Sequence, residues 1–194
     1  MTAPTTLCDL QARCAQGEHF EFLPFWSHRQ RTDGVVSASC LSQWFPARFE
    51  IEGVAYATAE HFMMAEKARL FDDRAILAKV LAAPTPDEAK SLGRKVRDYD
   101  DARWMAHRFD AVVRGNAAKF AQSPALRAFL LATGRRVIVE ASPVDAIWGI
   151  GMSADDTRVG DPAQWQGLNL LGFALMVVRA QLGAWTHASA PSRA

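Results

Sequence analysis

The chain has 194 residues, with 22 lysines and arginines against 21 aspartates and glutamates, so its formal net charge is +1. Its apolar fraction of 49% is typical of a globular protein and too high for a disordered one. The length predicts one domain with a sizeable core. The balanced charge argues against a protein that wraps duplex nucleic acid, although it leaves room for a local basic pocket that binds one phosphate or pyrophosphate.

No apolar run reaches the roughly 18–20 residues that span a bilayer. The longest candidate, 168–182, is interrupted by Gly172, Arg179 and Gln181. Residues 1–17 contain no continuous apolar core and do not resemble a secretory signal. The chain has three cysteines, and this odd count is typical of a reducing compartment. We therefore expect a cytoplasmic protein with no membrane partner.

Two strands and a hairpin are predicted. Residues 19–26 are aromatic-rich and alternate loosely, and residues 136–141 are rich in β-branched side chains. Between them, residues 48–51 and 54–56 flank the pair Glu52-Gly53, which is typical of a tight hairpin turn.

Capping residues predict where the helices begin. Thr58 is the expected N-cap of a helix through about residue 70, and Asp72 or Asp73 that of a helix ending near residue 83. The capping box 85–88 begins a third helix, which stops at Gly93.

Three more helices follow in the second half of the chain. Asp100 caps the first, in which four apolar side chains recur at helical spacing: Met105, Phe109, Val112 and Phe120. Ser123-Pro124 begins the second, which stops at Gly134, and residues 170–182 form the last. Strands and helices do not alternate, which argues against a doubly wound parallel sheet. The predicted fold is α+β, a predominantly helical single domain with a few short strands. We expect a weak helix or an N-terminal arm at 1–18, the domain at 19–183 and a flexible tail at 184–194.

Signature motifs of several enzyme classes are absent from the sequence. The chain has no G-x-x-x-x-G-K phosphate loop, no G-x-G-x-x-G after a strand and no G-x-S-x-G elbow. Its histidines and cysteines lack metal-ligand spacing, so we predict no metal site. Any catalytic or binding activity is therefore expected to depend on carboxylates, aromatic side chains and loop glycines.

One candidate group lies on the helix that Thr58 begins. Glu60, Met64 and Lys67 share a face, because seven residues of helix make about two turns and rise roughly 10 Å. A carboxylate and an ammonium could thus contact the two ends of an elongated ligand. The alternative is structural: the helix dipole favours a glutamate in the first turn, and Lys67 is then a solvated charge.

A second candidate group is the loop 140–151 after the last strand. It combines Asp145 with Trp148 and Gly149. Glycine lets the backbone approach a ligand closely, and the indole could stack on a planar base. The alternative is a tight turn whose tryptophan fills the core.

Aromatic and basic residues elsewhere are weaker candidates. Trp44 and Trp104 could be stacking platforms, although most aromatic side chains belong to the core. Arg94 could bind phosphate at a helix end, or serve as a solvated basic cap.

Taken in chain order, these segments resemble the NADAR family, also described as YbiA-like or as riboflavin biosynthesis intermediates N-glycosidases. The resemblance covers about residues 19–183. Its motifs are 41–46 (LSQWFP), 53–67 (GVAYATAEHFMMAEK), 83–86 with Ala89-Lys90 and Gly93-Arg94, Trp104, Lys119-Phe120, 130–134, the loop 140–151, and a closing helix with Asn169, Leu171, Gly172, Leu175, Met176 and Arg179. The sequence departs from related members at Ser27, where glycine is frequent, at Ala57, where proline is common, and in a longer segment 152–166.

The resemblance implies hydrolysis of an N-glycosidic bond in phosphoribosylamino-pyrimidine intermediates of riboflavin biosynthesis. It implies catalytic roles for Glu60 and Asp145. The substrate-binding candidates are Trp104, Trp148, Lys67, Arg94, Gly149, Trp44 and Asn169. A carboxylate near the sugar would stabilise an oxocarbenium-like centre or activate water, with no metal or redox cofactor.

Two alternatives stay open. Related family members are implicated in removing ADP-ribose from guanine bases, so ADP-ribosyl-guanosine or ADP-ribosylated nucleic acid is a second substrate class. A non-catalytic module that binds NAD or ADP-ribose is a third reading, but such a module would not need both Glu60 and Asp145. In each case the expected partner is a small nucleotide-like molecule.

Overall fold

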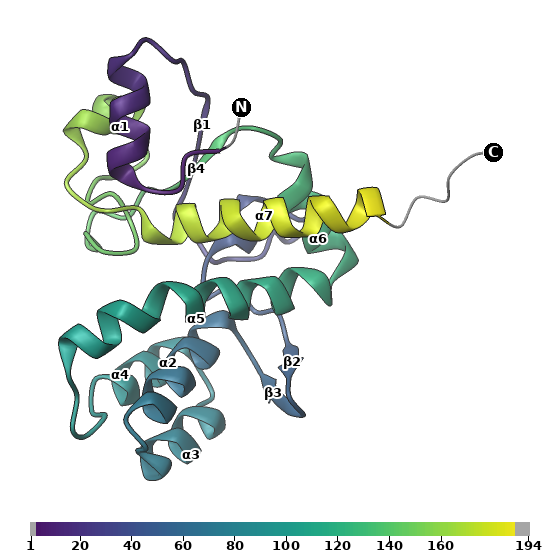
Figure 1. Cartoon of the computed structure of the whole chain (residues 1–194). Helices are drawn as coiled ribbons and strands as arrows, with labels where there is room; N and C mark the ends of the chain where they lie inside the picture. Colours follow the sequence, from purple (N-terminus) through teal and green to yellow (C-terminus); the bar gives the residue numbers. More distant parts are fainter. Residues whose placement is uncertain (1–2, 189–194) are drawn as a thin grey trace. The chain divides into compact units, whose positions relative to one another are not determined.

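The computed structural model describes residues 3–188, and the chain divides into two compact units. The first unit comprises residues 1–42 and 124–194, and the second comprises residues 43–123. Figure 1 labels the helices and strands of both units. The part of the predicted tail at 189–194 lies outside the described residues.

The first unit is built on a pair of parallel strands. β1 (Phe22–Phe25) pairs with β4 (Val137–Glu140), and Phe22 lies opposite Val137. Three consecutive β4 residues, 137–139, are fully buried, as expected of a parallel strand covered on both faces. Both strands were predicted from sequence, with slightly longer bounds.

Helix α7 (Leu170–Ala188) packs against β4 in this unit (Figure 1). Gly172 permits the close approach, because a Cβ atom at this position would collide with the carbonyl oxygen of Ile138. α6 (Pro124–Ala132) packs on α7 and ends two residues before the predicted stop at Gly134. α7 itself runs six residues past its predicted end at 182, into the segment predicted as a tail.

Shorter elements complete the first unit. α1 (Leu7–Ala15) begins at the cap Thr6 and packs on η3 (Pro162–Gln164), with the side chain of Leu10 fully buried. Of the two alternatives predicted for residues 1–18, a weak helix or an arm, the structure thus has a helix, and this helix is packed. The other single-turn elements are η1 (Ala38–Leu41) and η2 (Thr157–Gly160).

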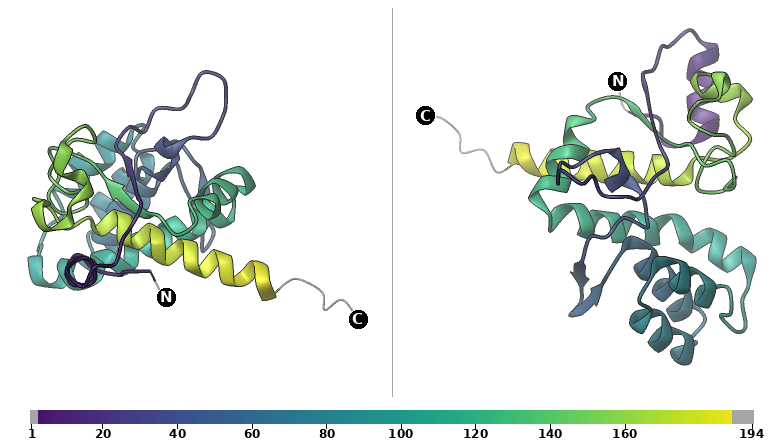
Figure 2. Two further views of the ribbon diagram at one scale, coloured as in Figure 1. Left: turned by 90° about the horizontal axis from the view of Figure 1, so that it is seen from above. Right: turned by 180° about the vertical axis from the view of Figure 1, so that it is seen from behind.

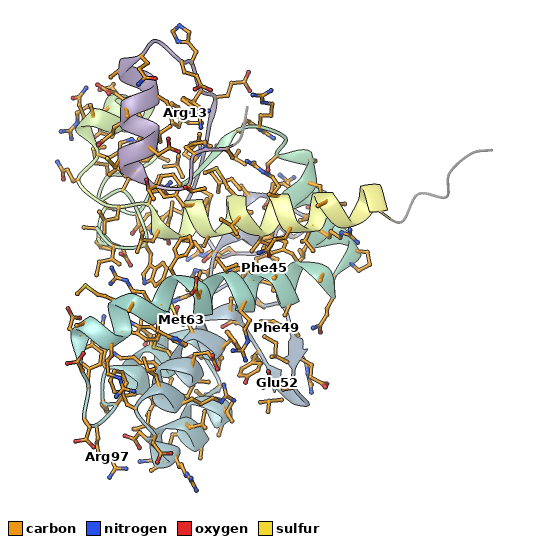
Figure 3. The ribbon with its side chains drawn as sticks, in the orientation of Figure 1. Arg13, Phe45, Phe49, Glu52, Met63 and Arg97 are labelled. Atoms are coloured by element: carbon orange, nitrogen blue, oxygen red, sulfur yellow. The ribbon has the colours of Figure 1, made fainter. Side chains whose placement is uncertain are left out.

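The second unit is a group of helices with one hairpin. β2 (Phe49–Ile51) and β3 (Val54–Tyr56) pair antiparallel. The turn residues Glu52 and Gly53 both have positive φ, at 53° and 75°, as a type I′ turn requires. Figure 3 labels Phe49 and Glu52 on this hairpin, which the sequence predicted.

Four helices follow the hairpin, and each begins at an N-cap anticipated from sequence. α2 (Ala59–Leu70) is capped by Thr58, α3 (Arg74–Ala82) by Asp73, α4 (Pro86–Gly93) by Thr85 and α5 (Asp101–Ala121) by Asp100. α2 packs on the other three, which Figure 2 shows gathered around it. The fold class is thus confirmed: the described chain is mainly helical, with two two-stranded sheets.

Candidate functional site

Glu60 lies in the first turn of α2, one residue after the helix begins. Its side chain is only 2% exposed, and its backbone N–H donates to the carbonyl of Gln43 at 3.0 Å. Burying a carboxylate costs free energy unless nearby groups stabilise its charge. The N-terminal end of α2 provides such stabilisation through the helix dipole. The structure thus holds this carboxylate in a defined place and removes it from bulk water.

Lys67 lies two turns along the same helix and is half-buried. Its Nζ atom is 4.1 Å from the ring centroid of Tyr99 and 5.9 Å from that of Trp104. Burial lowers the pKa of Lys67, an effect that Asp101 opposes and the positive charge of Arg94 reinforces. The second unit therefore brings Lys67 and Trp104 together, with Arg94 close enough to act on the ammonium.

Tyr99 was not among the residues singled out from sequence. It is 43% exposed, and its hydroxyl donates to a carboxylate oxygen of Asp101 at 2.6 Å. Burial together with this hydrogen bond raises the pKa of Tyr99 to about 12. A tyrosine in the loop before a helix gives no sequence signal of its own, because its cation–π contact with Lys67 joins two separate elements.

Trp104, Arg94 and Trp44 differ in their exposure. Trp104 is buried in the first turn of α5, at 7% exposure, whereas Arg94 is exposed at the end of α4. Trp44 is half-buried, with the Nζ atom of Lys90 at 5.7 Å from its ring centroid. α4 and α2 approach closely at Gly93, where a Cβ atom would collide with the side chain of Met64.

In the first unit, Asp145 orders the loop after β4. Its Oδ1 atom accepts hydrogen bonds from the backbone N–H groups of Ile147 at 2.9 Å and Trp148 at 2.8 Å. The carbonyl of Asp145 accepts a third hydrogen bond, from Gly151 at 3.2 Å. The indole of Trp148 is half-buried. Asp145 therefore fixes the backbone that carries Trp148, independently of any catalytic role of its carboxylate.

Gly149 and Asn169 join this loop to α7. The carbonyl of Gly149 accepts from the N–H of Asn169 at 3.0 Å, and a Cβ atom on Gly149 would lie 2.8 Å from the carbonyl oxygen of Glu140. Asn169 is fully buried, with φ at 53°. Its Nδ2 donates to the carbonyl of Ile138 at 2.9 Å, and its Oδ1 accepts from the N–H of Glu140 at 3.0 Å. Both amide atoms hold the end of β4, so Asn169 acts here as a positioning residue.

A second buried carboxylate on α2 has a structural explanation. Glu66 is 5% exposed, and its two oxygens accept from Arg69 at 2.8 Å and Arg114 at 3.1 Å. The imidazole of His107 lies 3.9 Å from the same carboxylate. This ion-pair cluster links α2 to α5 and provides a natural control for tests of Glu60.

The predicted residues divide between the units. Asp145, Trp148, Gly149 and Asn169 lie in the first, and Glu60, Lys67, Arg94, Trp44 and Trp104 lie in the second. Over the described residues, no group of three or more His, Cys, Asp or Glu side chains has the arrangement of a metal site. Nor is any helix in that stretch long and apolar enough to cross a membrane.

Comparison with known proteins identifies relatives along most of the chain. The NADAR domain family matches residues 24–183. An N-glycosidase of Acanthamoeba polyphaga mimivirus is 43% identical over 145 residues, which cover 72% of this chain and 85% of that protein. A riboflavin biosynthesis protein of Vibrio vulnificus is 32% identical over 142 residues, which cover 73% of this chain and 35% of that longer protein. The NMR structure of the Escherichia coli protein YbiA shares the fold, with a TM-score of 0.71 at 24% identity over 91% of this chain and 94% of that one.

Proposed function

We propose that this chain, which belongs to the NADAR domain family, hydrolyses the N-glycosidic bond of a phosphoribosylamino-pyrimidine. The broader class, a hydrolase of N-glycosyl bonds, is supported by a relative named N-glycosidase that aligns over 85% of its own length. The pyrimidine substrate is supported by the relative named for riboflavin biosynthesis. That relative is a longer protein, and the match covers 35% of its length, so its name supports the choice of substrate and not the reaction itself.

The observation that carries the proposal is the buried carboxylate of Glu60 at the start of α2. Cleavage of an N-ribosyl bond places positive charge on the sugar ring in the transition state. A carboxylate held out of bulk water stabilises that charge more strongly than a solvated one, because the local dielectric constant is lower. Glu60 meets this requirement better than Asp145, whose Oδ1 is already engaged by two backbone N–H groups.

Glu60, Trp148 and the residues that position Trp148 have different parts in the proposed reaction. Water adds to the anomeric carbon, the bond to the base nitrogen breaks, and one proton from water ends on the departing amine. Glu60 either stabilises the developing cation or takes the proton from the attacking water. Trp148 is the stacking candidate, because the part of its half-buried ring that solvent reaches can contact a base. Asp145 and Asn169 position the loop that carries Trp148.

The cations of the second unit suit a phosphorylated sugar. Lys67 lies seven residues beyond Glu60 on α2, a rise of roughly 10 Å along the helix axis, and Arg94 acts on its ammonium. A ribosyl phosphate presents its charged group several ångströms from its anomeric carbon. We therefore assign Lys67 and Arg94 to the phosphate and Glu60 to the sugar ring.

The experiment mixes the full chain separately with a phosphoribosylamino-pyrimidine, ADP-ribosyl-guanosine and NAD, and follows free base by chromatography. The proposal predicts release of the aminopyrimidine. Release from ADP-ribosyl-guanosine alone would overturn the pyrimidine substrate in favour of ADP-ribosyl-guanosine or ADP-ribosylated nucleic acid. Saturable binding of NAD or ADP-ribose, with no base released from any compound, would overturn catalysis itself.

A further inference from the structure

The first unit contains a cavity of about 850 Å³, within the range of small-molecule sites. Its walls come from α1 and the residues before it, the segment 18–21, the loop 133–136 between α6 and β4, and α7. Figure 3 labels Arg13, which lines the cavity from α1. None of the residues assigned above to catalysis or substrate binding is part of this lining.

Four arginines line the cavity, but they differ in how their charge is balanced. Arg13 forms two hydrogen bonds of 2.7 Å with the carboxylate of Glu18, so this pair is close to neutral. Arg179 is buried at 8% exposure, and its Nη1 donates to the hydroxyl of Thr133 at 2.7 Å and to the carbonyl of Arg136 at 2.8 Å. Both acceptors of Arg179 are neutral groups.

The guanidinium of Arg136 is held in the same way. It donates to the carbonyls of Thr133 at 3.1 Å and Ala132 at 3.3 Å. Throughout residues 3–184, whose side chains are described, no carboxylate forms an ion pair with Arg136 or Arg179. The positive charge of Arg136 lowers the pKa of Arg179, adding to the larger effect of burial. Two like charges at one wall, each donating to neutral acceptors, favour an anion between them.

The remaining walls indicate the rest of the ligand. Phe20 and Met176 contribute apolar surface. The Cζ atom of Arg13 lies 5.1 Å from the ring centroid of Phe20. Glu18 and Glu21 also line the cavity. Glu18 is engaged by Arg13, and the single charge of Glu21 is outnumbered by those of Arg135, Arg136 and Arg179, so the lining has a net positive charge. Arg135, the fourth arginine, is exposed and adds positive charge at the same loop. A small molecule with one anionic group and one apolar ring fits this distribution.

We propose that this cavity is a binding site for a phosphomonoester with an aromatic or heterocyclic ring, with the phosphate on Arg136 and Arg179 and the ring against Phe20 and Met176. The site goes beyond the proposed hydrolysis and does not depend on it. Half of its wall, residues 3–21, precedes the segment that matches the family at 24–183. The site thus belongs to this chain's N-terminal segment as much as to the family domain.

Calorimetric titration of the full chain tests the site without any measure of activity. The probes are phenyl phosphate, inorganic phosphate and phenol, which separate the contributions of the anion and the ring. We expect saturable binding of phenyl phosphate, weaker binding of phosphate and none of phenol. The variant Arg136→Gln should bind phenyl phosphate at least roughly tenfold more weakly, the loss expected for one charge-assisted contact.

Two further variants keep the test decisive. Arg135→Gln removes an exposed charge from the same loop and should weaken binding by a smaller factor without affecting the fold. Arg127→Gln is the matched control, because Arg127 also donates to a backbone carbonyl in this unit but does not line the cavity. Absence of saturable binding, or equal affinity in Arg136→Gln and Arg127→Gln, would overturn the proposal.

Discussion

The ammonium of Lys67 lies 4.1 Å from the ring centroid of Tyr99, on the face of α2 that also carries Glu60. This contact joins α2 to the loop before α5. It gives the half-buried ammonium an aromatic partner, since none of the ion pairs found among residues 3–184 involves Lys67. The ring stabilises the charge, while burial works against it.

The lowered pKa of Lys67 predicts a pH dependence of substrate binding. The ammonium loses its proton at a pH below the ordinary lysine value of about 10.4, because burial disfavours the charged form. The KM for a phosphorylated substrate should therefore rise with pH before an ordinary lysine would titrate. In Lys67→Arg, which stays charged, this rise should move to higher pH. An alkaline limb unchanged between wild type and Lys67→Arg would remove Lys67 from phosphate binding.

Gly115 should resist replacement although it lies within α5. Alanine normally stabilises a helix by roughly 0.5–1 kcal/mol relative to glycine. At Gly115, however, the added Cβ would lie 2.6 Å from the ring of Phe62, which is fully buried. We expect Gly115→Ala to lower the free energy of unfolding by about 1–3 kcal/mol, the usual cost of overpacking.

Gly183 provides the opposite case for the same measurement. It lies within α7, and among the side chains that the structure describes its added Cβ would meet that of Leu131, at an ordinary 3.8 Å. Gly183→Ala should therefore stabilise the chain by a few tenths to about 1 kcal/mol. Denaturant unfolding of both variants checks the pair, and a stabilised Gly115→Ala would show that the packing of α5 on Phe62 is looser than described.

Asp73 should make the stability of the second unit sensitive to acid. Its buried carboxylate caps α3 through Ile76 and accepts three hydrogen bonds from Arg97, two from the guanidinium and one from the backbone. Arg97 holds the pKa of Asp73 well below its usual range. The stabilisation is therefore complete above the unfolded value of about 3.9 and is lost as the pH falls below it.

The test for Asp73 is a set of thermal melts at pH 7 and near pH 3. Asp73→Asn keeps an N-cap acceptor but removes the charge, so its Tm should be lower at pH 7 and approach the wild-type value in acid. Asp72→Asn is the control, because Asp72 pairs with Arg74 at the surface, where both side chains are more than 80% exposed. Equal melting of Asp73→Asn and wild type at pH 7 would contradict this account.

Trp148 is expected to contribute more to binding than to stability. Trp148→Ala should weaken substrate binding by roughly 1–3 kcal/mol, the scale of base–aromatic stacking. The fold should survive, with some loss of stability because the ring is half-buried. The neighbouring Ile147→Ala, which truncates an exposed apolar side chain, should have little effect. Collapse of Trp148→Ala to an unfolded protein would show instead that the indole is part of the core.

Local signals in the sequence predicted much of the fold. Thr58, Asp73, Thr85 and Asp100 each cap a helix through a side chain that accepts from the backbone N–H three residues further along the chain. Such signals need no tertiary context. The hairpin turn at Glu52-Gly53 is equally local, because Gly53 readily adopts the positive φ that this turn requires.

Features that depend on distant parts of the chain were not predictable in the same way. The parallel pairing of Phe22 with Val137 joins segments more than a hundred residues apart, and neither strand specifies its partner. On α2, both Glu60 and Glu66 are buried because helices surround it, so helical periodicity could not distinguish the candidate from the structural carboxylate. Asn169 was noted through family resemblance, but its two bonds to β4 emerge only in the folded unit.

The most direct test of the central claim is turnover of the phosphoribosylamino-pyrimidine by Glu60→Gln, with a thermal melt of the same sample. Glutamine keeps the size of the side chain but removes its charge, and general-base or electrostatic roles contribute about 10²–10⁴-fold in rate. Glu66→Gln is the matched control: it should lower the Tm by breaking its pairs with Arg69 and Arg114, while its folded fraction keeps turnover within a few-fold of wild type. The account predicts a folded Glu60→Gln whose turnover falls at least roughly 10²-fold. A folded Glu60→Gln with near-wild-type turnover would contradict it.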